Sequence, residues 1–75
     1  MATVRVSGWK PGMRKISLTK LVQTGGGKDL AQAKAMVDGL LEGNPFEVSF
    51  DNEEAARSFA DQAKDLGAEA TTKQR

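Results

Sequence analysis

The sequence lacks several residue types on which most enzymes and metal sites depend. Its 75 residues include no cysteine, no histidine and no tyrosine. Without cysteine, a disulfide, a thiolate metal site and a thiol nucleophile are excluded. Without histidine, the chain has no imidazole to act as a general base or a metal ligand. We therefore expect a protein that is not an enzyme and that holds no metal ion or cofactor.

Long apolar runs are also missing. No stretch approaches the roughly 18 apolar residues of a membrane-spanning helix, and residues 1–5 lack the apolar centre of a signal peptide. The composition, with 39% hydrophobic and 28% charged residues, lies in the range of globular proteins. We expect residues 1–75 to form a single domain that is cytoplasmic, does not contact a membrane and is a monomer.

Opposite charges collect in the two halves of the chain. Residues 1–34 carry seven basic residues and one acid, a net charge of +6, whereas residues 35–75 carry four basic residues and nine acids, a net charge of −5. Lys15, Lys20 and Lys34 make up a candidate basic face that would attract an acidic protein surface. A solvated face with no partner accounts for the same charges equally well.

Hydropathy patterns predict three strands and three helices. Strands are indicated where apolar and polar residues alternate, and helices where apolar residues recur at i, i+3 and i+4. The predicted elements are a strand at 2–8, a helix at 14–24, a helix at 30–41, a strand at 46–50, a helix between Asp51 and Gly67 and a weak strand at 68–72.

Local signals indicate where some of these elements begin and end. Asp29 and Asp51 are predicted to cap the second and third helices, because each is followed three positions later by a glutamine or glutamate. The three phenylalanines stand at core spacing, and we expect all of them in the core: Phe46, Phe50 and Phe59. Residues 73–75 are predicted to be a frayed tail.

The order of elements predicts an α+β fold, a two-layer sandwich in which three helices cover one face of a three-stranded sheet. The strand–helix–strand unit at the end leaves its two strands parallel. We expect the first strand to lie between them, antiparallel to both.

Three segments resemble the C-terminal domain of the bacterial large-subunit stalk ribosomal protein. Residues 30–38 (LAQAKAMVD) are similar to its helix motif LKEAKDLVE, and residues 63–70 (AKDLGAEA) are similar to its closing run. Residues 15–22 fit its first-helix segment without a gap. The resemblance covers residues 4–73 and implies the same α+β fold.

The resemblance also implies a function. In that family the domain recruits translation GTPases, such as elongation factors, to the ribosome through its first two helices. By position, the family's contact surface would be carried here by Lys15, Lys20, Leu30, Ala33 and Lys34. The lysines would orient an acidic partner, and Leu30 with Ala33 would form the desolvated centre.

Several positions depart from the family pattern. Gln23 stands where the family has an arginine, Thr19 replaces an apolar residue, and Lys28 is a lysine that the family lacks. The family's N-terminal dimerisation domain and hinge have no counterpart in the sequence. We therefore expect a stand-alone relative that binds a protein, and we add Lys28 to the candidate binding residues.

A second family has the same fold, the small adaptor that delivers substrates to a bacterial AAA+ protease. Its acidic loop after the first strand is replaced here by residues 9–12 (WKPG), and its pocket histidine has no counterpart. A proteolysis adaptor or regulatory module that uses Trp9 and Lys10 as a second interface is the alternative. Trp9 also fits a simpler role, packing against the rim of the sheet.

Two further functions are weakly supported by the residues. Residues 25–29 (GGGKD) lack the spaced glycine and the serine or threonine of a phosphate-binding loop, so they are predicted to form a helix–helix turn. Lys28 at the start of the second helix favours at most a weak anion contact. Nucleic acid is disfavoured as a partner, because no second aromatic residue accompanies the basic cluster.

Overall fold

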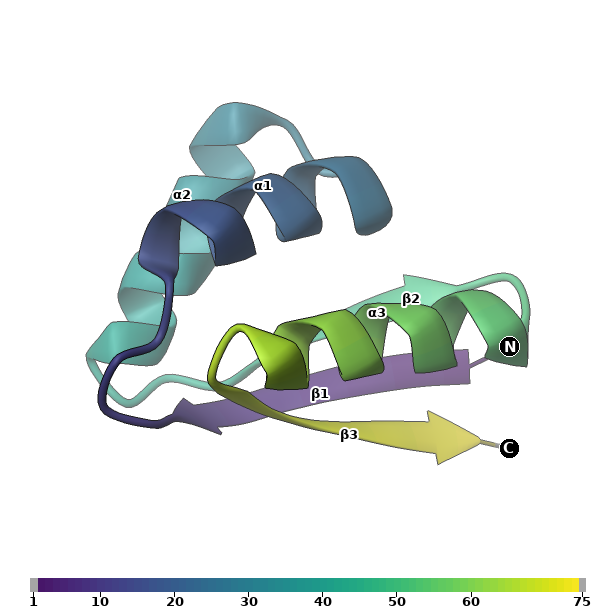
Figure 1. The fold of residues 1–75 in the computed structure, drawn as a ribbon. Coiled ribbons are helices and arrows are strands. Elements are labelled where there is room, and N and C mark those ends of the chain that lie inside the picture. Colours follow the sequence, from purple (N-terminus) through teal and green to yellow (C-terminus); the bar gives the residue numbers. More distant parts are fainter. Residues whose placement is uncertain (1, 75) are drawn as a thin grey trace.

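The computed structural model describes residues 2–74, and it contains three strands and three helices in the predicted order. Figure 1 shows the helices gathered on one side of the sheet. The elements are β1 (Ala2–Trp9), α1 (Lys15–Gly25), α2 (Leu30–Leu41), β2 (Phe46–Phe50), α3 (Glu53–Asp65) and β3 (Ala68–Gln74). The predicted α+β sandwich is confirmed.

The strands lie in the order β2-β1-β3, so β1 is the central strand. It pairs antiparallel with β2, where Val4 lies opposite Val48, and antiparallel with β3, where Val4 lies opposite Thr72. β2 and β3 are therefore parallel to each other, and the chain crosses from one edge to the other through α3 (Figure 1). This is the arrangement that the sequence predicts.

The core lies between the sheet and the helices. Every second residue of β1 from Ala2 to Val6 is fully buried, and each helix contributes a buried stripe. Phe59 on α3 is the largest buried side chain, and its ring centroid lies 5.3 Å from that of Phe50. The core consists of Ala2, Val4, Val6, Leu18, Val22, Ala33, Val37, Leu40, Val48, Ala56, Phe59, Ala60, Ala63, Ala68 and Ala70.

Two of the three predicted core phenylalanines are only partly buried. Phe46 and Phe50 pack against the core from its margin, whereas Phe59 is inside it. They lie at the two ends of the edge strand β2, whereas Val48 at its centre is buried. The sequence pattern shows which face of a strand is apolar but not where the strand lies in the sheet.

The helix caps agree with the prediction at one helix and differ at another. Asp29 caps α2 as expected, and its carboxylate accepts a hydrogen bond of 2.7 Å from the backbone N–H of Gln32. At α3 the predicted cap, Asp51, is wrong, since the Asn52 side chain accepts from the Ala55 amide at 2.8 Å. The helix begins one residue later than the acidic pattern indicates.

The last strand is longer than predicted. Lys73 pairs with Thr3 and Gln74 pairs with Ala2, so these two residues continue β3 rather than fraying. The backbone bonds of the ladder outweigh the polar composition of this segment. Arg75, the last residue of the predicted tail, lies outside the described residues.

The turn between α3 and β3 holds the loop that leads into α1. The Lys10 amide donates to the Gly67 carbonyl at 2.8 Å, and the Arg14 amide donates to the Leu66 carbonyl at 2.9 Å. Gly67 has φ +99°, and a Cβ built on it would lie 2.9 Å from Met13 Cα. Only glycine fits this close approach of two backbones.

This close approach predicts that Gly67→Ala is more destabilising than the same change at Gly43, which has φ +96° but no atom near its would-be Cβ. Gly43→Ala should cost about 1–2 kcal/mol of unfolding free energy for backbone strain alone. Gly67→Ala should cost about 1–3 kcal/mol more, because the loop at Met13 must also move. Urea unfolding followed by Trp9 fluorescence measures both. Equal losses would show that the contact with Met13 is easily relieved.

Candidate protein-binding groove

A groove of about 640 Å³ runs over the surface formed by α1 and α2. Five of its lining residues come from α1 and two from α2. We call this surface the α1–α2 groove, and it is lined by Lys15, Ile16, Thr19, Lys20, Gln23, Leu30 and Lys34.

The centre of the α1–α2 groove is apolar and open to solvent. Ile16 is 75% exposed and Leu30 is 53% exposed. Of the described residues, only these two and Trp9 are large hydrophobics with so much exposed surface. An exposed pair of branched side chains in one groove is typical of a surface that a partner covers.

The periodicity of α1 explains why Ile16 is left outside the core. The buried side of α1 is formed by Leu18 and Val22, four residues apart on one face. Ile16 precedes Leu18 by two positions, which turns it about 200° around the helix axis and away from the sheet. Leu30 is the first residue of α2, ahead of the buried stripe that begins at Ala33.

Ile16 is a site residue that the sequence prediction missed. The apolar stripe of an amphipathic helix marks the residues that become buried, and Ile16 lies off that stripe. A branched aliphatic residue opposite the buried stripe, beside a lysine, is the signal that identifies it.

The lysines of the groove differ in their surroundings. Lys15 Nζ lies 2.7 Å from Asp38 Oδ1, which joins the start of α1 to the later part of α2. Within residues 2–74, Lys20 and Lys34 make no ion pair. The positive charge offered to a partner therefore comes mainly from Lys20 and Lys34.

The side-chain hydroxyl of Thr19 is hydrogen-bonded within its own helix. Its hydroxyl donates to the Lys15 carbonyl one turn earlier at 2.9 Å, and the residue is 8% exposed. A hydroxyl that is already bonded within the helix does not require a polar group from a partner. The polar residue at this position therefore leaves the centre of the groove suited to an apolar side chain.

The structure brings together four of the six predicted binding residues. Lys15, Lys20, Leu30 and Lys34 all line the α1–α2 groove. Ala33 is fully buried in the core, so the expectation that it forms part of the contact centre is wrong for this conformation. It faces inward because it shares the buried stripe of α2. Lys28 does not line the groove.

The glycine segment before Lys28 forms the turn between the two helices. Gly25 ends α1, Gly26 is its C-cap, and Gly27 has φ +68°. The Gly26 amide donates to the Val22 carbonyl at 3.0 Å, which closes the helix. The segment is a helix–helix connection, as predicted, and it does not follow a strand as a phosphate-binding loop does.

The second predicted interface, Trp9 with Lys10, lies outside the α1–α2 groove. The pairing of β1 with β3 shifts between Val6 and Gly8, and Ser7 is left as an extra, exposed residue. After this bulge Trp9 pairs with the buried Ala68, which places Trp9 on the helix side of the sheet. It is nevertheless 42% exposed.

No protein-family model matches the sequence, and no curated protein is significantly similar to it. Within residues 2–74, no helix is long and apolar enough to cross a membrane. The same residues do not bring three or more aspartates and glutamates together as metal ligands.

The geometry predicts that Ile16 and Leu18 contribute very differently to stability although they are two residues apart. Ile16→Ala should change the free energy of unfolding by no more than about 0.5 kcal/mol, because the side chain is exposed. Leu18→Ala should lower it by about 2–5 kcal/mol, because it leaves a cavity in the core. Urea denaturation measures both values, and a large loss for Ile16→Ala would mean that this residue belongs to the core.

Proposed function

We propose that this chain is a small protein-binding module that holds an acidic partner in the α1–α2 groove. The observation that carries the proposal is the exposure of Ile16 and Leu30 beside Lys20 and Lys34, two lysines that form no ion pair with any of residues 2–74. Apolar side chains of the partner would cover the centre, and its acidic groups would meet the lysines at the rim.

A protein fits this groove better than a nucleic acid does. The residues lining it include no aromatic side chain on which a base would stack. One of the three lysines is already paired with Asp38, which reduces the charge available to phosphates. The exposed aliphatic pair, in contrast, is typical of the desolvated centre of a protein interface.

The partner we propose is a translation GTPase of the elongation-factor type. This part of the proposal rests on the resemblance of residues 15–22 and 30–38 to the stalk-protein domain. Its support is that the residues corresponding to the family's contact surface are those that line the groove, apart from the buried Ala33.

Replacing Lys34 with glutamate should slow association with a bacterial elongation factor by about five- to tenfold at low salt and flatten its salt dependence. Stopped-flow or surface-based kinetics measures the rate. Lys64→Glu makes the same change of charge on α3, away from the groove, and is the matched control. If both variants slowed association equally, the effect of Lys34 would come only from the net charge of the domain, and the groove model would be contradicted.

A titration of the isotope-labelled domain with the same factor tests the location and the partner together. Amide shifts should concentrate on residues 15–21 and 30–34 and weaken as salt is added. The absence of shifts at high micromolar factor would reject the translational partner. A set of shifts elsewhere on the domain would reject the groove.

A second candidate function uses the exposed ring of Trp9, as an adaptor or regulatory module would. Trp9 is held at the end of β1 by its pairing with Ala68 and is 42% exposed. Trp9→Ala should abolish binding of such a partner and leave binding in the α1–α2 groove within about twofold. Loss of elongation-factor binding in this variant, with the fold intact, would favour the second candidate.

A further inference from the structure

The outer edge of β2 is the starting point for a second interaction surface. β2 is an edge strand and pairs with β1 on one side only. Within residues 2–74, no backbone hydrogen bond joins β2 to a loop or a helix. An edge strand of this kind offers free N–H and C=O groups to another strand.

The sequence of β2 reads the same in both directions at its apolar positions. Phe46, Val48 and Phe50 occupy one face, and Glu47 and Ser49 occupy the other. An antiparallel pair of identical strands centred on Val48 places Val48 opposite Val48 and Phe46 opposite Phe50. Each apolar side chain then meets an apolar side chain, and Glu47 meets Ser49 rather than a like charge.

The two edges of the sheet are not equivalent. On β3 the residues on the helix side, Ala68 and Ala70, are small and buried. On β2 the larger Phe46 and Phe50 are only partly buried at the margin of the core. The β2 edge therefore has apolar surface left to cover, and the β3 edge does not.

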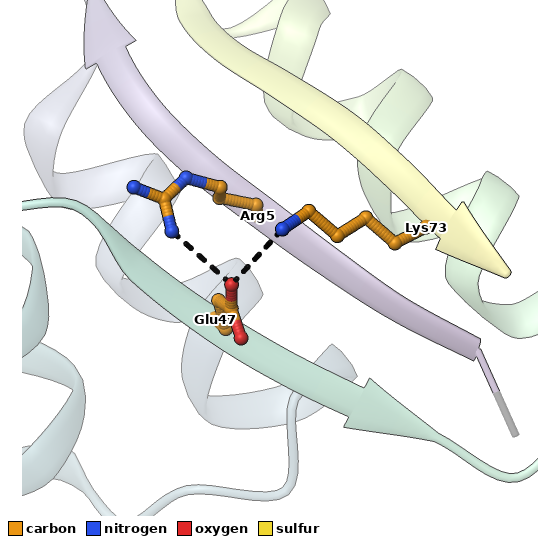
Figure 2. Close-up of polar contacts among 3 residues, drawn as sticks. All are labelled: Arg5, Glu47 and Lys73. Atoms are coloured by element: carbon orange, nitrogen blue, oxygen red, sulfur yellow. Dashed lines mark hydrogen bonds and ion pairs between the residues drawn. The ribbon is translucent and has the colours of Figure 1, made fainter. Parts of the chain in front are cut away.

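A charge cluster on the solvent face of the sheet suits the same pairing. Arg5 Nη1 lies 3.2 Å from Glu47 Oε2, and Lys73 Nζ lies 3.6 Å from the same oxygen. Figure 2 shows both basic side chains converging on Glu47 from β1 and β3. In the symmetric pair the two Glu47 side chains would be diagonal neighbours about 7–8 Å apart. Arg5 and Lys73 neutralise each of them from within its own subunit.

We propose that the chain self-associates weakly through β2, and that the partner at this edge is a second copy in antiparallel register about Val48. The two sheets then form one six-stranded sheet with the order β3-β1-β2-β2-β1-β3. A single short strand pair buries little surface, which places the dimer in the weak, transient class. This departs from the monomer expected from the sequence, and it leaves the α1–α2 groove out of the interface.

Substitutions at Ser49 test the register, because this exposed residue would lie opposite Glu47 of the second copy. Ser49→Lys should tighten the dimer through two opposite-charge pairs, and Ser49→Glu should weaken it through two like-charge pairs. The dissociation constants should differ by roughly tenfold, measured by sedimentation equilibrium or NMR diffusion up to about 1 mM protein. Within the monomer, Ser49 faces Thr3, so both charges are tolerated.

The matched controls are Thr71→Lys and Thr71→Glu, which place the same charges at an exposed position on the other edge strand. Their dissociation constants should agree within about twofold. The proposal would be overturned if the two Thr71 variants differed in dimer dissociation constant as much as the two Ser49 variants do. It would also be overturned if the wild-type chain stayed monomeric at about 1 mM.

A dilution series of amide spectra of the wild-type chain gives a test that needs no substitution. The largest concentration-dependent changes should fall on Phe46–Phe50. Changes centred on Ile16 and Leu30 would instead mean that copies associate through the α1–α2 groove, and the β2 model would be wrong.

Discussion

The double pairing of β1 is the constraint on which the rest of this small domain depends. β1 is hydrogen-bonded on both sides, and its inward side chains, Ala2, Val4 and Val6, are fully buried. All three helices lie on this one face of the sheet (Figure 1). A chain of 75 residues has few buried positions to offer. Once the stripes of the helices fill that layer, large residues such as Ile16 and Leu30 remain at the surface, and the groove follows from this shortage of interior space.

Much of the fold could be predicted because its signals are local. The alternation around Val48 and the helical spacing of the apolar residues define β2 and α2 to the residue. The cap at Asp29 could be recognised from the glutamine three positions later, and its bond is present. Asp51 and Asn52 are adjacent and are both good caps, so only the end of β2 decides that Asn52 is the one that caps α3.

The site could be predicted only in part, because exposure is a property of the whole packing. Charge and the family resemblance both indicate Lys15, Lys20 and Lys34, and the structure places all three along the groove. The residue type does not show whether Ala33 is buried or exposed, because alanine is compatible with either position on a helix. The bulge at Ser7 has no clear mark in the sequence, yet it decides on which side of the sheet Trp9 lies.

The ends of the described chain have a mechanical consequence. Ala2 pairs with Gln74, so β1 begins where β3 finishes, and Figure 1 shows the two ends next to each other. A force that pulls these ends apart acts across the antiparallel ladder and loads its hydrogen bonds one after another. The hydrogen bonds between β1 and β3 would break one pair at a time, beginning at this end. The unfolding force would be much lower than for a fold in which the terminal strands are pulled in shear, where all the bonds share the load. Tension at the ends would therefore uncover β1, the central strand against which α2 and α3 pack.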